Sequence, residues 1–293
     1  MLLITDLDNT LYDWVTFFAE SFQAMLRELG VLLQRPESEL IQEFKALHQY
    51  YGTSEQPFAV LELPAVGEHF GPLSRVELLN HLDVPLHAFN RARKQFLKLY
   101  DGVDETLRRL SAQGVTIVGH TEAIAANGFY RLQRLGIQRY FTRLYALEGN
   151  YKGHPDPVRA AALQPPPGFV RFVPQGERKP HPLLLRDICA QEGKSIRECW
   201  YVGDSIVRDI SMAREAGANA VWARYGTRYD RKHWELLVKI THWTKEDVLR
   251  EERLHSIYDK VQPDYTIDCF DELLRLMLSH GPSEASRLQR HLQ

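Results

Sequence analysis

Cysteine is scarce in this chain of 293 residues, and so are long apolar runs. The three cysteines, Cys189, Cys199 and Cys269, are odd in number and have no paired spacing, which gives no zinc pattern and suits a reducing compartment. No apolar run is long enough to cross a bilayer, and the first residues lack the basic region of a signal peptide. We therefore expect a cytoplasmic protein that does not contact a membrane.

An excess of one charge is also missing. The 36 Lys and Arg residues nearly balance 38 Asp and Glu residues, which leaves a formal net charge of -2. Without a broad basic footprint we expect no nucleic-acid partner. The chain shows no internal repeat, and its length provides one large domain or two modest ones with ample material for a core.

Short apolar runs alternate with segments that have helical periodicity. This order predicts an α/β fold, a Rossmann-like, doubly wound parallel sheet whose two faces are covered by helices. The expected strands are Leu2 to Ile4, Val115 to Gly119, Arg143 to Ala146, Cys199 to Val202, Ala218 to Ala223 and Tyr265 to Ile267.

Between the first two strands the pattern is helical, with Phe18, Phe22 and Met25 at three- and four-residue spacing. One helix is expected from about Val15 to Gly30, and another from Ala123 to Leu135 after the second strand. We expect an α/β core at 1–16 and 100–293 and an all-helical domain at 17–99, with an irregular insert at about 148–178 and a helical insert at about 225–260.

The first strand ends in two carboxylates, Asp6 and Asp8. In an extended chain alternate side chains share a face, and two anions about 4 Å apart repel by roughly 4 kcal/mol at an effective dielectric constant of 20. A cation or a shared proton would relieve that repulsion. The alternative is a solvated strand end followed by a turn, which Asp, Asn and Thr also favour.

Ligands in such sheets bind beyond the carboxyl ends of the strands. We therefore expect the acidic and hydroxyl groups there to converge, and acidic oxygen ligands are those that Mg²⁺ prefers. As the alternative, Asp204 and Ser205 would only cap a helix and Asp209 would be a solvated helix position. The residues in question are Asp6, Asp8, Thr10, Thr121, Asp204 and Asp209.

A cation for an anionic substrate is available in Lys179, which precedes Pro180, His181 and Pro182 at the start of a predicted helix. A single lysine is most often a solvated surface residue, and Lys152 is a rival. Lys179 is preferred because one helix separates it from the strand that leads to Asp204.

Together these residues resemble the phosphatase branch of the haloacid dehalogenase superfamily. The resemblance covers residues 1 to about 16 and about 100 to 224, and the helical segment between the first two motifs looks like the helical cap of that family. The four motifs appear in order as Asp6-Leu7-Asp8-Asn9-Thr10, Thr121, Lys179-Pro180, and Gly203-Asp204 followed by Asp209.

The resemblance implies a role for each matched residue. Asp6 would attack phosphorus and form an aspartyl phosphate, and Asp8 would protonate the leaving alcohol and then activate water. Asp6, Asp204 and the backbone carbonyl of Asp8 would hold Mg²⁺. Phosphate oxygens would bind Thr121 and Lys179, and Thr10 and Asp209 would support the site.

The expected function is a Mg²⁺-dependent phosphomonoesterase acting on a small phosphorylated metabolite, either a sugar phosphate or a nucleoside monophosphate. A phosphomutase on the same site is one alternative, and a catalytically silent regulatory or assembly subunit is another. The inserts at about 148–178 and 225–260 could also form contacts with a second copy of the chain, in a homo-oligomer. Glu122 departs from the family pattern, which often has Asn or another neutral residue after the hydroxyl residue. An acidic group beside Thr121 disfavours a nearby phosphate unless its side chain turns away.

Overall fold

The computed structural model describes residues 1–149, 153–162, 164–174, 176–258 and 260–279. Seven strands form one parallel sheet in the order β4-β3-β2-β1-β5-β6-β7, so the predicted α/β class is confirmed. The strands are β1 (Leu2–Thr5), β2 (Thr116–Ile124), β3 (Arg143–Leu147), β4 (Val170–Val173), β5 (Cys199–Gly203), β6 (Asn219–Ala223) and β7 (Tyr265–Ile267).

The central strand is β1, whose four residues are all buried. It pairs with β2 on one side and β5 on the other, with Leu2 opposite Thr116 and Cys199. The order of the strands reverses beside β1, and ligands of doubly wound sheets bind beyond the carboxyl end of such a position. The residues that follow Thr5 therefore lie where a site is expected.

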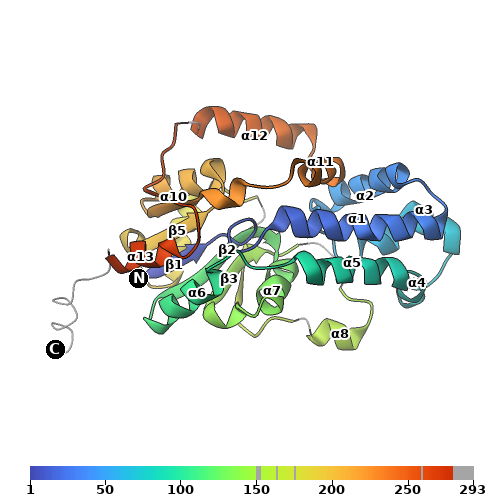
Figure 1. The fold of residues 1–293 in the computed structure, drawn as a ribbon, viewed down its shortest axis with the longest axis horizontal. Helices are drawn as coiled ribbons and strands as arrows, with labels where there is room; N and C mark the ends of the chain where they lie inside the picture. Colours follow the sequence, from blue (N-terminus) through green and yellow to red (C-terminus); the bar gives the residue numbers. More distant parts are fainter. Residues whose placement is uncertain (150–152, 163, 175, 259, 280–293) are drawn as a thin grey trace.

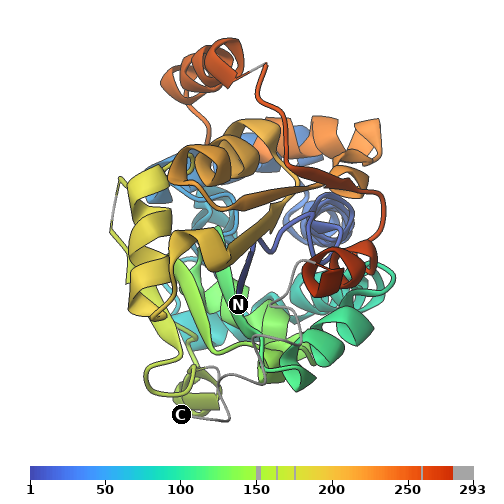
Figure 2. The ribbon, with the colours of Figure 1, turned by 90° about the vertical axis from the view of Figure 1, so that its left-hand side faces the viewer.

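Successive β1 side chains enter different cores, which is why the run Leu2, Leu3, Ile4 is apolar throughout. Leu2 and Ile4 pack in one cluster with residues of two helices, and Leu3 packs in the other cluster with residues of other helices. Helices thus cover both faces (Figure 2). The helices are α9 (Pro182–Gln191) and α10 (Ser211–Ala216) on the first face, and α6 (Val103–Ala112), α7 (Ala125–Arg134) and α13 (Glu272–Ser279) on the second.

Residues 14–96, here called the helical insert, lie beside the sheet and contain no strand (Figure 1). Their aromatic core joins Phe22 to Phe44, whose rings are 4.8 Å apart. This core continues into the sheet core on the Leu3 face. The helices are α1 (Trp14–Leu33), α2 (Glu37–Tyr51), α3 (Pro64–Phe70), α4 (Arg75–His81) and α5 (Asp83–Phe96), with a 3-10 turn at Ala59–Glu62.

Several element ends differ from the prediction. Helix α1 continues past Gly30 to Leu33, because Leu33 extends the buried apolar face and the left-handed turn falls at Gln34. Strand β2 continues to Ile124, which is buried and pairs with Leu147 of β3 after a shift in register. Thr121 consequently lies within the strand, and α7 begins at residue 125 rather than 123.

The C-terminal half holds additional elements. Part of segment 148–178 is regular, since it contains α8 (Pro157–Ala162) and β4. Two further helices, α11 (Arg231–Ile240) and α12 (Lys245–Tyr258), follow β6, and α11 packs against α1 and α2 of the helical insert (Figure 1). Among the described residues no helix is both long and apolar enough to span a membrane.

Candidate active site

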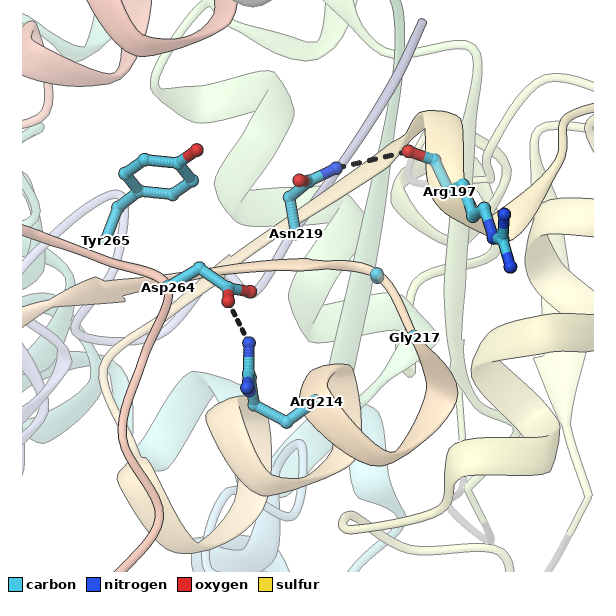
Figure 3. A pocket seen from close by; sticks show the side chains of 7 residues that line it. Arg197, Arg214, Gly217, Asn219, Asp264 and Tyr265 are labelled. Carbon is cyan, nitrogen blue, oxygen red and sulfur yellow. Dashed lines mark hydrogen bonds and ion pairs between the residues drawn. The ribbon is translucent and has the colours of Figure 1, made fainter.

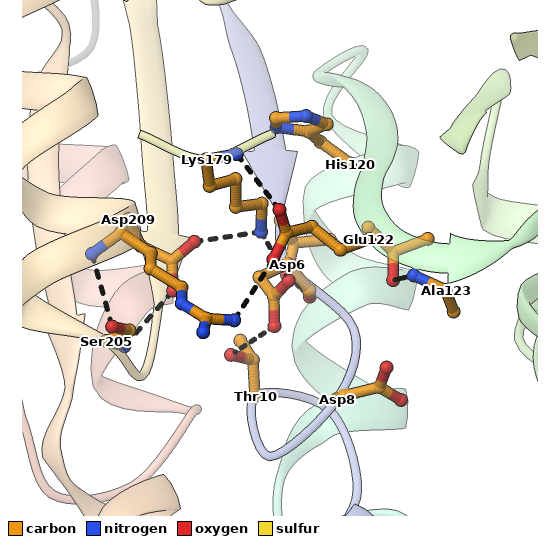
Figure 4. Close-up of polar contacts among 12 residues, drawn as sticks. Asp6, Asp8, Thr10, His120, Glu122, Ala123, Lys179, Ser205 and Asp209 are labelled. Carbon is orange, nitrogen blue, oxygen red and sulfur yellow. Dashed lines mark hydrogen bonds and ion pairs between the residues drawn. The ribbon is translucent and has the colours of Figure 1, made fainter. Parts of the chain in front are cut away.

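At the carboxyl end of β1, the ammonium group of Lys179 lies between two carboxylates (Figure 4). Lys179 Nζ donates to Asp6 Oδ1 at 2.5 Å and to Asp209 Oδ1 at 2.8 Å, and all three side chains are buried. Burial disfavours the charge on Lys179, yet Asp209 and Asp6 raise its pKa well above the usual range. Lys179, which the sequence analysis offers as a cation for an anionic substrate, therefore lies directly against two of the acidic candidates.

Asp204 joins this group as its third carboxyl group. Carboxylate oxygens of Asp6, Asp204 and Asp209 all lie within 4.8 Å of one another, where Lys179 supplies one positive charge for three carboxylates. Burial raises the pKa of Asp6 to about 7, and burial followed by the charges of Asp209 and Asp6 raises the pKa of Asp204 well above its usual range. Three hard oxygen donors with surplus negative charge fit a divalent cation such as Mg²⁺.

Asp209 is held by the turn that follows β5. A single π-helical turn, Ile206–Ile210, places Asp209 Oδ2 3.1 Å from the backbone N–H of Ser205, and Tyr201 donates its hydroxyl to Oδ1 at 3.1 Å. A Cβ at Gly203 would lie only 2.4 Å from Asp209 Cγ. Glycine at 203 therefore allows the carboxylate to fold back against the end of the strand.

Residues from the C-terminal half of the chain hold the turn that follows Asp6. Asn9 takes a left-handed conformation with φ of 56°, and Thr10 Oγ1 donates to Asp6 Oδ2 at 3.2 Å. Tyr225 donates its hydroxyl to the Thr10 carbonyl at 2.6 Å. A Cβ at Gly226 would come within 1.9 Å of the Asn9 carbonyl oxygen, so the chain at 226 passes directly against this turn.

Asp8 has different partners from Asp6. Strand β1 ends at Thr5, so the alternation expected for an extended chain does not govern the two aspartates. Asp8 Oδ1 accepts from the hydroxyl of Tyr12 and from Arg131 Nη1, each at 2.7 Å, and its carboxylate points away from Lys179 (Figure 4). Arg131 was missed by the sequence reasoning, since a single arginine in a helical pattern carries no motif.

Glu122 turns toward the backbone of the loop that carries Lys179, here called the lysine loop. Its Oε1 accepts from the Lys179 N–H at 3.0 Å, and its Oε2 accepts from Arg208 Nη1 at 3.1 Å (Figure 4). Arg250 of α12 donates to the Lys179 carbonyl at 3.3 Å. Side chains from β2 and α12 thus hold both backbone groups of Lys179, and part of the charge of Glu122 is offset by Arg208.

The remaining candidates have local partners. Thr121 is buried, and its hydroxyl accepts from the backbone N–H of Ala123 at 3.0 Å. His120 Nδ1 lies 3.3 Å from the hydroxyl of Tyr201, and His181 Nδ1 accepts from the Leu184 N–H at the start of α9. Lys152, the rival of Lys179, lies outside the described residues.

A hollow on the opposite, amino-terminal edge of the sheet is lined by polar residues, two pairs of which bond to each other (Figure 3). Arg214 forms an ion pair with Asp264, and the Asn219 amide donates to the Arg197 carbonyl at 3.3 Å. Because Asn219 begins β6, this hollow is separated by the length of the sheet from the carboxylates beyond β1 and β5.

Comparison with known families agrees with this geometry. The family model described as haloacid dehalogenase-like hydrolase matches residues 1–217, and a second, described as HAD-hydrolase-like, matches residues 177–273. The chain belongs to the haloacid dehalogenase-like hydrolases.

Three relatives illustrate the similarity. The chain is 24% identical over 231 residues to a glyceraldehyde 3-phosphate phosphatase of Methanopyrus kandleri, covering 78% of this chain and 85% of that protein. It is 26% identical over 230 residues to a phosphoglycolate phosphatase of Pseudomonas fluorescens, covering 78% and 71%. A 2-haloacid dehalogenase structure from Pseudomonas syringae shares the fold, with a TM-score of 0.56 at 18% identity over 95% of this chain and 97% of that one.

Proposed function

We propose that this protein is a Mg²⁺-dependent phosphomonoesterase that hydrolyses a small phosphorylated metabolite through an aspartyl phosphate. The observation that carries the proposal is the group of buried Asp6, Lys179 and Asp209 with half-buried Asp204 at the carboxyl end of the central strand. The two phosphatases among its relatives, which are named for small phosphate esters, support this substrate class. In this proposal the helical insert is the cap that covers the substrate.

The carboxylates would hold the metal and one of them would also react. Asp6 and Asp204, supported by Asp209 and by the backbone carbonyl of Asp8, would bind Mg²⁺, which supplies charge neutralisation for the phosphoryl group. Asp6 Oδ attacks phosphorus while the bond from phosphorus to the ester oxygen breaks. The leaving alcohol takes its proton from Asp8. Asp8 then takes a proton from water as that water attacks phosphorus and releases Asp6 and inorganic phosphate.

Positive charge and hydrogen bonds would stabilise the transferring group. Lys179 Nζ is already aimed at Asp6 Oδ1, so a phosphoryl group on Asp6 would meet this cation without rearrangement of the backbone. Thr121 is assigned to a phosphate oxygen by its place in the family motif. Thr10, which donates to Asp6 Oδ2, would hold the nucleophile in one orientation.

The direct test is phosphate release from a panel that includes phosphoglycolate, glyceraldehyde 3-phosphate, sugar phosphates and nucleoside monophosphates. We expect turnover with Mg²⁺, loss of turnover with EDTA, and recovery when Mg²⁺ is restored. Asp6→Asn removes the nucleophile and should leave no measurable activity, whereas Asn90→Asp, a change of similar size on α5, should leave activity intact. Isomerised substrate without free phosphate would identify a phosphomutase instead, and an inactive wild type would favour a silent regulatory subunit.

A further inference from the structure

A buried arginine connects the catalytic region to the helical insert. Arg131 of α7 is 3% exposed, and its guanidinium group donates to Asp8 Oδ1 and to the Glu55 carboxylate. The centre of the guanidinium group lies 5.2 Å from the ring centre of Phe17. Arginine is rarely buried unless it is paired, and its planar fork can serve two carboxylates at once.

Glu55 is itself held by α1, which belongs to the helical insert, and by α7, which packs on the sheet. It lies in the helical insert between α2 and the 3-10 turn that begins at Ala59. Trp14 Nε1 of α1 donates to Glu55 Oε1 at 2.8 Å, and the Asn127 side chain of α7 donates to the Glu55 carbonyl at 2.9 Å. The series Asp8, Arg131, Glu55 therefore runs without a gap from the turn after β1 into the helical insert.

The geometry around Asp8 distinguishes its two oxygens. Tyr12 and Arg131 both donate to Oδ1, and in the described part of the chain no donor is assigned to Oδ2. Two donors on one oxygen fix the plane of the carboxyl group. Oδ2 is consequently the oxygen to which the described residues donate no hydrogen bond, and its direction depends on where Tyr12 and Arg131 hold Oδ1.

We propose that Arg131 is a positioning residue for Asp8, and that Glu55 makes this positioning depend on contact with the helical insert. The inference rests on the proposed function, in which Asp8 protonates the leaving alcohol. When the helical insert lies against α7, Glu55 holds the second arm of the guanidinium group, and Arg131 directs Asp8 Oδ2 toward the ester oxygen. When that contact is broken, Glu55 no longer holds Arg131 in place, and Tyr12 is left as the fixed donor that orients Asp8.

Leaving-group dependence tests this role. An alkyl phosphate needs a proton on its leaving oxygen, whereas p-nitrophenyl phosphate releases a stable anion and needs little acid assistance. Hydrolysis of the aspartyl phosphate is common to both esters and comes after the step that kcat/KM reports, so a residue that acts through Asp8 lowers kcat/KM selectively for the alkyl ester. A residue needed only for folding or metal binding affects both substrates alike.

The experiment measures kcat/KM for the most active alkyl phosphate and for p-nitrophenyl phosphate, with Asp8→Asn as the reference for a lost acid. We expect Arg131→Met to lower kcat/KM for the alkyl ester about 10- to 100-fold and for the aryl ester less than about 3-fold. Glu55→Gln should show a smaller loss with the same selectivity. Arg131→Lys should recover part of the loss, since an ammonium group can still contact Asp8. Arg134→Met, an exposed change on the same helix, is the matched control and should alter neither value.

Equal losses on both substrates, or no loss on either, would overturn the inference while Asp6→Asn and Asp8→Asn still support the proposed function. An inactive wild-type protein would overturn both. Thermal unfolding of each variant checks that it is folded. If Arg131→Met does not fold, Arg131→Lys and Glu55→Gln provide the same comparison between the two esters.

Discussion

Acidification should weaken the contact between the helical insert and α11, because that contact buries a neutral histidine. His48 of α2 is 2% exposed, and its Nδ1 lies 2.7 Å from the carbonyl of Ile240, the last residue of α11. A carbonyl only accepts, so the ring donates this hydrogen bond. Burial lowers the pKa of His48 to about 4, against a smaller opposing effect of the hydrogen bond to Ile240.

The size and sign of the effect follow from this pKa. An unperturbed histidine has a pKa of 6.5, so between pH 6.5 and about 4 the unfolded chain binds a proton at His48 that the folded chain does not. The contribution of His48 to stability is complete above pH 6.5 and is lost as pH falls through this window. At about 1.4 kcal/mol per pH unit, a fall to pH 5.0 costs about 2 kcal/mol, and a fall to pH 4 costs about 3 kcal/mol.

Urea unfolding at pH 7.5 and at pH 5.0 isolates this contribution when wild type is compared with His48→Asn. Asparagine keeps an N–H donor near the position of Nδ1 but does not titrate. We expect the wild type to lose about 2 kcal/mol more than the variant between the two pH values. His87→Asn, at an exposed position of α5, controls for the loss of a histidine. The same pH dependence in wild type and His48→Asn would refute the reasoning.

Three further changes test the site. Gly226→Ala should lower stability by about 1–3 kcal/mol in urea unfolding, because its Cβ would meet the Asn9 carbonyl, whereas Gly67→Ala in α3, where nothing lies within 4 Å, should be neutral or stabilising. Glu122→Ala should lower kcat/KM about 10-fold by freeing the Lys179 N–H, and Glu122→Gln, which keeps an acceptor, should stay near wild type in phosphate release. Lys179→Met should lower the free energy of unfolding by about 3–5 kcal/mol, since Asp6 and Asp209 would be left unpaired; an unchanged unfolding midpoint would contradict this.

The centre of the sheet could be predicted because β1 and β5 are buried on both faces and so appear as short, uninterrupted apolar runs. The convergence of Asp6, Asp204 and Asp209 followed from the same fact, since residues beyond the carboxyl ends of parallel strands meet at one edge. What failed was local. The end of β2 was placed too early because the strand continues beyond its β-branched run, through a shift in register that no propensity reports.

Contacts between distant elements were beyond the reach of the sequence. Arg131 and Asp8 are separated by 123 positions, and a helical arginine has the same appearance whether it is solvated or buried. Glu122 was recognised as unusual, yet its direction toward the Lys179 backbone depends on where the lysine loop passes. Tertiary placement decides both cases, and neither periodicity nor motif spacing encodes it.

The segment after β6 supports the candidate site from two directions. Tyr225 and Gly226 lie against the turn that carries Asn9 and Thr10, and Arg250 of α12 holds the carbonyl of Lys179. Between these two points α11 packs on the helical insert. One stretch of chain, from Tyr225 to Arg250, thus contacts the turn of Asn9 and Thr10, the helical insert and the lysine loop in succession. Because Asp6 accepts hydrogen bonds from Thr10 and from Lys179, both of its side-chain donors lie in segments that this C-terminal stretch contacts.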